Sequence, residues 1–345
     1  MEEAARGDEA VPKVLSDRYG VDLASAEPVP IGTETINRRV TLADSRRIYI
    51  RQYRITADLE RAQAAWAMSE FCRTARVPTP RVWRNRDGEI LTCVDGTGWV
   101  VTDEAPGQVA TEPLTAPRAQ HIGLLLGRMH LALASYPAPA RTRQTQWRAA
   151  PLDRVLAETD AVLERAVAQG DPQLGQLRGE LEQRRADLHK HTQRLRAGLP
   201  EHLVAQAGHA DFTRTSLLAQ EDLITAVLDF QAETCLPAWE LGRAAFDSRT
   251  VANSASWPQT ALRMIESYRV ENPHLPLTDI RASARIALLY MLFSLHGATT
   301  DEYGLPAATE ADLRRYWAER QVAICRLLDE LDDLEAVLAG LGQGR

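Results

Sequence analysis

The chain has 345 residues, of which 45% are hydrophobic and 25% are charged, a composition that is ordinary for a globular protein. Its formal net charge of −7 argues against a general binder of nucleic acid or of anionic membranes, because both reward basic surface patches. The length exceeds that of one average domain and suits a two-lobed enzyme with a sizeable core.

The cysteines and the N-terminus restrict the cellular context. The chain has four cysteines, far apart and without a C-x-x-C pair: Cys72, Cys93, Cys235 and Cys325. Zinc ligation and a disulfide framework therefore lack support, and we expect buried free thiols in a reducing compartment. The N-terminus is acidic and lacks the apolar segment of a signal peptide. The longest apolar run, residues 284–297, is too short to span a bilayer, so we expect a cytoplasmic protein.

The first hundred residues predict a β-rich lobe. We expect a disordered tail over residues 1–12 and then a short helix that ends at Gly20. Two β-rich segments joined by a short polar turn predict a hairpin over residues 36–53. Apolar residues at helical spacing predict a helix over residues 57–75. Further extended segments are expected over residues 77–83, 89–94 and 98–107.

From about residue 115 onward the pattern becomes helical. Helices are expected over residues 117–134, 151–170, 171–195, 239–252, 258–270, 277–297 and 309–340. One hairpin, over residues 209–231, interrupts them. The sequence thus predicts an α+β protein with an N-terminal lobe over residues 13–105 and a helical C-terminal lobe over residues 106–345.

The embedded hairpin carries the most informative residues. Asp211 lies on a short turn before one strand-like run, and Asp229 ends the next run. Two carboxylates that a hairpin brings together suit phosphoryl transfer. One carboxylate takes the proton of the attacking hydroxyl, and the other holds magnesium on the nucleotide phosphates.

Several short motifs occur in a telling order. They are VPTP at 77–80, LLLGRMH at 124–130, HADFTRTS at 209–216, VLDF at 227–230 and PAWELG at 237–242. In that order they resemble the aminoglycoside phosphotransferase family, the small-molecule relatives of the protein kinases. The resemblance covers roughly residues 15–300 and implies the two-lobed protein-kinase-like fold, with an antiparallel sheet and one helix in the small lobe.

The resemblance implies roles for the residues of the hairpin. Asp211 is the expected catalytic carboxylate, His209 supports its loop by hydrogen bonding, and Asp229 is the expected metal ligand. Ser216 departs from the pattern, because the second metal ligand of the family is an asparagine. Either Ser216 ligates the metal, or water fills the gap, or one ion is held weakly. Arg214 either adds charge near the γ-phosphate or is a solvated surface arginine.

The strand that carries a lysine in the kinases carries Arg51 here, and arginine can hold phosphate oxygens bidentately. The alternative is that Arg51 is one more exposed arginine. Strand alternation places Tyr49, Arg51 and Tyr53 on one face of the sheet. The acid that should pair with Arg51 lies on the following helix. Glu60 is the candidate, and Gln63 and Glu70 are open alternatives on the same segment.

Two further segments are expected to contact the nucleotide. The loop over the phosphates would include Gly32 and Thr33, although one glycine makes it a weak motif, and a plain hairpin loop is the alternative. The hinge that binds the base through backbone groups would consist of Asp103, Glu104 and Ala105. In the last motif Glu240 replaces an aspartate of the family and would brace the catalytic loop.

The resulting hypothesis is an ATP- or GTP-dependent enzyme that uses Mg²⁺ to phosphorylate a hydroxyl of a small molecule. An antibiotic of the aminoglycoside, peptide or nucleoside type is the leading acceptor, in a resistance or self-protection role. A metabolic kinase for homoserine, choline or a sugar is the alternative, and a catalytically dead pseudokinase that acts as a binding module is another. No nucleic-acid or membrane partner is expected, and both a monomer and a homodimer remain open.

Overall fold

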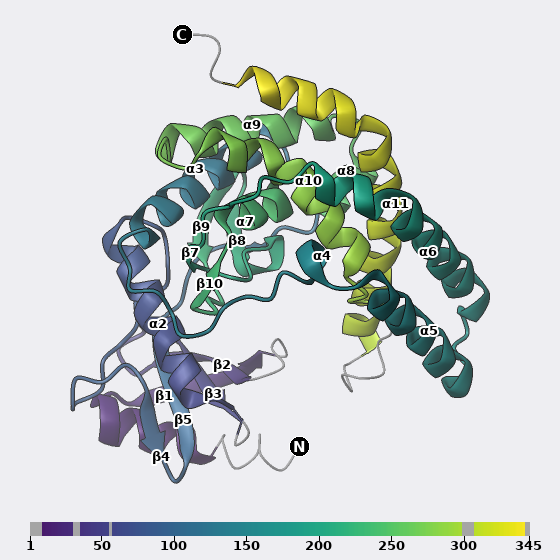
Figure 1. Cartoon of the computed structure of the whole chain (residues 1–345). Coiled ribbons are helices and arrows are strands. Elements are labelled where there is room, and N and C mark those ends of the chain that lie inside the picture. The colour runs from purple at the N-terminus through teal and green to yellow at the C-terminus, as the bar shows by residue number, and fades with distance from the viewer. Residues whose placement is uncertain (1–8, 30–34, 55–56, 299–306, 342–345) are drawn as a thin grey trace. The chain divides into compact units, whose positions relative to one another are not determined.

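The computed structural model describes residues 9–29, 35–54, 57–298 and 307–341. The chain divides into two compact units (Figure 1). Unit 1 consists of Met1–Ala110, Ala132–Pro139 and Ala207–Glu233, and unit 2 consists of Thr111–Leu131, Ala140–Gln206 and Thr234–Arg345. The mixed α+β class is confirmed, with an antiparallel sheet in the N-terminal region and a mostly helical remainder.

Unit 1 is built on a five-stranded antiparallel sheet with the strand order β1-β2-β3-β5-β4. Its strands are β1 (Leu23–Val29), β2 (Thr35–Leu42), β3 (Arg47–Tyr53), β4 (Thr92–Val94) and β5 (Thr97–Asp103). The predicted hairpin is present as β2 and β3, and its turn includes Ser45 at φ 69°. Strand β1 was not predicted, because its residues are mostly exposed and lack a clear alternation.

A short N-terminal helical segment covers one face of this sheet. Residues 9–14 are helical and continue into a π-helical turn, Leu15–Tyr19, which Gly20 ends in the left-handed conformation at φ 70°. Val11 and Val14 are 1% exposed and pack in one cluster with Ile48 and Ile50 of β3. Four residues of the expected tail, 9–12, therefore belong to a helix that closes a core.

The other face of the sheet packs against α2 (Leu59–Thr74), the helix predicted over residues 57–75. Asp58 caps the helix, since its side chain accepts a hydrogen bond from the Arg61 amide. Trp66 of α2 packs with Tyr53 and Val100 from the sheet. This face carries the odd-numbered side chains of β3, as the alternation predicts.

The hairpin that carries Asp211 and Asp229 also belongs to unit 1. Strands β8 (Leu217–Gln220) and β9 (Leu223–Val227) pair with β6 (Gln108–Val109) in a second antiparallel sheet of order β6-β8-β9. The Val227 amide donates to the Pro78 carbonyl at 2.7 Å. The structure thus groups the hairpin with the β-rich lobe, whereas the sequence placed it in a C-terminal lobe that begins at residue 106.

Gly107 occupies a position that a side chain would not fit. Its φ is 106°, and a Cβ atom there would lie 2.5 Å from the Thr225 hydroxyl and 2.8 Å from the Ala219 carbonyl. The Thr225 hydroxyl donates to the Pro106 carbonyl beside it. Directly after the lobe boundary expected at residues 105–106, the chain therefore passes close to the edge of the hairpin, and glycine suits this position.

Unit 2 is helical. Its helices are α3 (Ala116–Leu133), α4 (Gln146–Ala149), α5 (Leu152–Gln169), α6 (Leu174–Ala197), α7 (Pro237–Ala245), α8 (Ser248–Asn253), α9 (Trp257–Glu271), α10 (Leu277–Phe293) and α11 (Ala307–Gly340). Two short strands, β7 (Gln206–Gly208) and β10 (Glu233–Cys235), flank the hairpin in sequence. The helix expected over residues 239–252 is two helices, because Asp247 caps α8 and starts a new direction.

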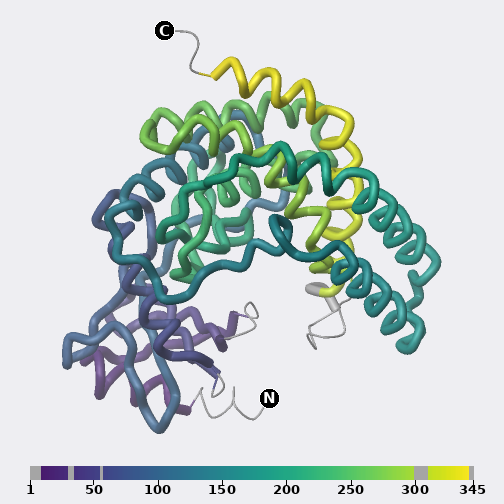
Figure 2. The backbone as a smooth tube through the Cα atoms, viewed as in Figure 1, coloured from purple at the N-terminus to yellow at the C-terminus, as the bar shows by residue number. Residues whose placement is uncertain are grey.

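Helices α5 and α6 lie side by side (Figure 2). They share an apolar cluster that includes Val162 and Leu177. Helix α10 is buried along most of its length, which explains the long apolar run of the sequence. In the part of the chain that the structure describes, no helix combines the length and hydropathy needed to cross a membrane. None of the four cysteines, all of which lie in the described residues, forms a disulfide; Cys72 and Cys235 are buried as expected, whereas Cys93 and Cys325 are exposed.

Candidate active site

His209 joins the two halves of the hairpin that carries Asp211 and Asp229. Its side chain is fully buried, and its Nε2 donates a hydrogen bond of 2.6 Å to the carbonyl of Leu228. Its Nδ1 accepts from the amide of Asp211 at 3.2 Å. One ring therefore fixes the backbone of Asp211 and of the residue before Asp229. This geometry suits a positioning role for His209, and a buried ring with both nitrogens engaged is poorly placed to react.

Ser216 braces the same loop. It is 3% exposed, and its hydroxyl donates to the carbonyl of Asp211 at 3.0 Å. Its own carbonyl accepts from the Leu228 amide at 2.8 Å. The hydroxyl oxygen keeps lone pairs for a further partner, since a hydroxyl accepts as well as donates. Arg214 lies in the short helical turn η2 (Arg214–Ser216) and is partly exposed.

Four non-glycine residues in or directly after the hairpin lie in the left-handed region: Ala210 at φ 64°, Glu221 at φ 52°, Asp229 at φ 60° and Ala232 at φ 49°. Aspartate tolerates this conformation better than alanine does. Ala210 stands where the resembled family has glycine, so the positive φ explains that glycine. Strained backbone of this kind is often found where side chains must be aimed at a site.

Arg51 and Asp229 form an ion pair, with 2.9 Å between Nη1 and Oδ1. The side chain of Arg51 is 16% exposed and that of Asp229 is 47% exposed. Burial pushes the pKa of Arg51 down, but the Asp229 carboxylate outweighs it and the net pKa lies above its ordinary value. The structure therefore brings together the residue expected to hold phosphate and the residue expected to hold metal.

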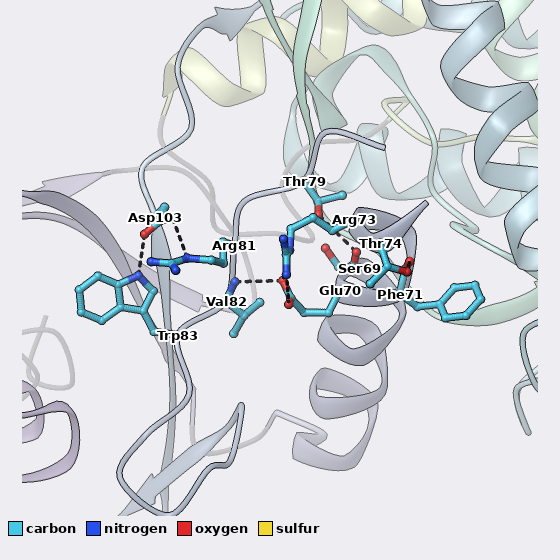
Figure 3. A network of polar contacts seen from close by, with 10 residues as sticks. All are labelled: Ser69, Glu70, Phe71, Arg73, Thr74, Thr79, Arg81, Val82, Trp83 and Asp103. Carbon is cyan, nitrogen blue, oxygen red and sulfur yellow. Dashed lines mark hydrogen bonds and ion pairs between the residues drawn. The ribbon is translucent and has the colours of Figure 1, made fainter. Parts of the chain in front are cut away.

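The acid expected on the helix after β3 does not pair with Arg51. Glu60 is exposed, and no ion pair joins it to Arg51 in the described part of the chain. Glu70 accepts two hydrogen bonds from the Arg73 guanidinium and one from the Val82 amide (Figure 3). In this structure Arg51 pairs with Asp229. The pairing of Glu60 with Arg51 therefore stays a prediction for the nucleotide-bound state.

The side chains of Asp103 and Glu104, in the expected hinge, form hydrogen bonds and ion pairs with other residues of unit 1. Asp103 accepts from the Trp83 indole at 2.6 Å and from Arg81 at 3.1 Å (Figure 3). The carboxylate of Glu104 lies 2.6 Å from Arg39 and 2.8 Å from Arg47.

The backbone amides of the three expected hinge residues differ in whether they donate a hydrogen bond within the protein. The amides of Asp103 and Glu104 donate to the carbonyls of Arg81 and Arg47. The amide of Ala105 donates to no residue that the structure describes. Of the three expected hinge residues, Ala105 thus offers a backbone donor to a ligand. The other expected nucleotide contacts, Gly32 and Thr33, lie outside the described residues.

Sequence reasoning missed two contacts of α2. The Trp66 ring lies under Arg51, with 5.2 Å from Cζ to the ring centroid. Arg61 donates to the side-chain oxygen of Gln231, two residues after Asp229. Helical spacing marked Trp66 only as part of an apolar stripe, and nothing in the sequence marked Arg61.

Unit 2 contains a buried polar network around Glu240. Its carboxylate lies 3.0 Å from His130 Nε2 and 3.4 Å from the Cys235 thiol, and His130 Nδ1 lies 2.9 Å from the Tyr268 hydroxyl. Glu240 and His130 are fully buried, and burial raises the pKa of Tyr268. The network joins the helix motif at 124–130 to the motif at 237–242, so these two sequence signals share one structural role. Buried networks of this kind specify how the helices pack.

A kinase-like lobe that holds a cationic side chain beside a hairpin with two carboxylates defines a phosphotransferase. The model of the phosphotransferase enzyme family APH matches residues 25–274 of the chain. The chain belongs to this family, and it is an enzyme of the kinase type that acts on a hydroxyl group. No curated protein matches the sequence.

Solved structures of low sequence identity share the fold. A spectinomycin phosphotransferase, APH(9)-Ia, in complex with ADP and spectinomycin has 12% identity and a TM-score of 0.63, covering 96% of this chain and 98% of its own. An aminoglycoside phosphotransferase from Alicyclobacillus acidocaldarius has 16% identity and a TM-score of 0.61, covering 93% and 95%. A microcompartment-associated aminopropanol kinase has 16% identity and a TM-score of 0.58, covering 96% and 99%.

Proposed function

We propose that the protein transfers the terminal phosphoryl group of ATP or GTP to a hydroxyl of a small molecule, with an antibiotic as the leading acceptor. The observation that carries the proposal is the connection of Asp211 and Asp229 through His209, with Arg51 on Asp229. Phosphoryl transfer depends mainly on positioning and on charge stabilisation, and these residues supply both.

Asp211 is the proposed catalytic carboxylate. It orients the acceptor hydroxyl and takes its proton as the oxygen attacks phosphorus. The His209 ring and the Ser216 hydroxyl hold the backbone on both sides of that carboxylate, at the Asp211 amide and carbonyl. The loop is thereby fixed before substrate binds, so little reorganisation is needed in the transition state.

The donor set of the hairpin suits Mg²⁺. Asp229 offers a half-exposed carboxylate and Ser216 a hydroxyl, and magnesium prefers oxygen ligands. Within the described residues no cluster of three or more His, Cys, Asp or Glu could hold a metal on protein ligands alone. When bound at the hairpin, magnesium would neutralise charge on the phosphates.

Arg51 and the hinge are the proposed nucleotide contacts. Arg51 exchanges its ion pair with Asp229 for the α- and β-phosphates, which its guanidinium can hold bidentately. The Ala105 amide donates to the base. Gly32 and Thr33 are proposed to contact phosphate through their backbone and hydroxyl groups, and Arg214 to add positive charge near the γ-phosphate.

The acceptor class is proposed from the relatives of the fold. Phosphotransferases for spectinomycin and other aminoglycosides share the fold, which supports an antibiotic and a resistance or self-protection role. The aminopropanol kinase supports the metabolic alternative, a small amino alcohol or similar metabolite.

The test is a screen of hydroxylated antibiotics and small amino alcohols with Mg-ATP and with Mg-GTP, read as a phosphate-sized gain in acceptor mass. We expect one acceptor class to gain the mass with the wild type and to lose that gain in the Asp211→Asn variant. Thermal stabilisation by nucleotide without any acceptor turnover would favour the pseudokinase. If the protein shows neither thermal stabilisation by nucleotide nor turnover of an acceptor, the proposal is overturned.

A further inference from the structure

We propose that Trp66 of α2 is a positioning residue for the nucleotide-binding arginine, and that its ring face takes the place of the acidic partner used in kinase-like lobes. The inference rests on the proposed function, in which Arg51 binds phosphate. It concerns how the lobe holds Arg51 ready for a nucleotide.

The first observation is the stacking geometry. The Cζ atom of Arg51 lies 5.2 Å from the centroid of the Trp66 ring. That is within the distance of about 6 Å at which a cation is attracted to a ring face, and tryptophan has the strongest such face. A planar guanidinium stacks on an aromatic ring, which an ammonium group does less well. The presence of arginine in place of lysine therefore fits the ring below it.

The second observation is that the ring itself is held in place. The indole Nε1 of Trp66 donates to the Tyr53 hydroxyl at 2.8 Å, and both side chains are 8% exposed. Tyr53 lies on the same face of β3 as Arg51, two residues further along the strand. The hydrogen bond fixes the plane of the ring, so the guanidinium meets a surface of defined orientation.

The third observation is that α2 gives Arg51 no carboxylate. Glu60 is exposed, and Glu70 is bound by Arg73 and by the Val82 amide (Figure 3). In the described residues the ion pair of Arg51 is with Asp229, from the hairpin. When phosphate takes the guanidinium from Asp229, the neutral ring remains as the contact from α2.

Because the Trp66 ring is neutral, it affects the attraction of Arg51 for phosphate differently from a carboxylate. A carboxylate on α2 would compensate part of the charge of Arg51, whereas the ring leaves the full charge for the phosphates. Trp66 thus positions the arginine without weakening its attraction for an anion. Its effect on nucleotide affinity should act entirely through Arg51.

The experiment measures the dissociation constants of non-hydrolysable ATP and GTP analogues, with Mg²⁺, on the full chain. We expect Trp66→Leu to weaken binding by about 3- to 30-fold, the range of a partly to fully desolvated cation–π contact. Trp66→Phe, which keeps a ring face, should stay closer to the wild type. Leu91→Ala is the matched control, because Leu91 belongs to the same apolar cluster and is equally buried at 8% exposure. It should lower stability and leave nucleotide affinity unchanged.

A double-mutant cycle separates positioning from folding. In an Arg51→Met background, Trp66→Leu should have no further effect on affinity. Fluorinated tryptophans at position 66 give a second measurement if Trp66→Leu does not fold, because fluorine weakens the ring face with little change of shape. Affinity should then fall stepwise with fluorine content.

Three results would overturn the inference. Trp66→Leu could bind nucleotide as tightly as the wild type, or it could lose as much nucleotide affinity in the Arg51→Met background as in the wild type. The third is a nucleotide affinity that does not change with the fluorine content of the tryptophan. A wild-type protein that binds neither analogue would instead refute the proposed function itself.

Discussion

The hairpin of Asp211 and Asp229 and the sheet face that carries Arg51, here called the nucleotide face, hold their charged side chains in position in different ways. In the hairpin, backbone groups are held by side chains: His209 and Ser216 bond to main-chain atoms of Asp211 and Leu228. On the nucleotide face, side chains hold side chains: Arg51 rests on Trp66 and pairs with Asp229. The first arrangement depends on a fixed loop conformation, whereas the second can change its chemistry one residue at a time. The hairpin keeps both carboxylates of the family motif and departs from it at Ala210 and Ser216, whereas the β-rich lobe departs at Arg51.

The largest expected effect tests the hairpin. Asp211→Asn keeps the shape and the hydrogen bonds of the backbone but removes the proton acceptor. We expect turnover to fall by about 10²- to 10⁴-fold, the usual contribution of a general base, with nucleotide affinity largely unchanged. Steady-state kinetics on the identified acceptor, together with nucleotide titration, measures both quantities. Near-normal turnover in this variant would exclude Asp211 as the base.

The next largest effect is expected on nucleotide affinity, from a substitution of Arg51. Arg51→Met removes a charged partner of phosphate, and we expect nucleotide affinity to fall by about 10- to 100-fold, the range for hydrogen bonds to charged groups. The same change frees the Asp229 carboxylate. Binding of Mn²⁺ without nucleotide, followed by electron paramagnetic resonance, should therefore become tighter. Arg54→Met, on the exposed residue just after β3, is the control and should change neither quantity.

A smaller effect is expected on the Mg²⁺ dependence of turnover, from a substitution of Ser216, which stands where the family motif has asparagine. Ser216→Asn supplies the longer amide ligand of the family motif, and we expect the concentration of Mg²⁺ that half-saturates turnover to fall by several-fold, toward a tenfold limit of about 1.4 kcal/mol. Thr215→Asn, on the exposed neighbour, is the matched control. If activity falls while the metal dependence stays the same, Ser216 serves the acceptor and does not ligate metal.

The smallest effect tests the backbone of the hairpin. Ala210→Gly relieves a positive φ of 64° but removes a buried methyl group. The two contributions are of similar size, about 1 kcal/mol each, so the free energy of unfolding should change by less than about 1 kcal/mol. Ala210→Val should destabilise by more than that, because a β-branched side chain fits a positive φ poorly. Chemical denaturation of the two variants measures the contrast.

The sequence predicted the hairpin well, because its information is local. Asp211 and Ser216 lie just before β8 and Asp229 lies just after β9, so two short paired strands leave little freedom for the backbone between them. The alternation of β3 likewise placed Tyr49 and Arg51 on one face correctly. The positive φ of Ala210 was also within reach, since the family motif has glycine there.

The partner of Arg51 could not be predicted, because it depends on how α2 is rotated against the sheet. Glu60, Trp66 and Glu70 lie on one helix, and periodicity alone does not say which of them faces the strand. The packing of Trp66 against Tyr53 and Val100 decides this, and it is a tertiary contact between distant segments. The engagement of Glu70 with the Val82 amide is likewise visible only in three dimensions.

The pairing of β6 with β8 bears on how the gene can be divided. A fragment that stops at residue 110 would carry β6 without its neighbour and the Pro78 carbonyl without the Val227 amide. It would also lack Asp229, the ionic partner of Arg51. Expression of the β-rich lobe by itself should therefore yield an exposed strand edge that invites aggregation. A split protein would need the segment 207–233 supplied in trans, so a reporter of complementation could be built on that short peptide.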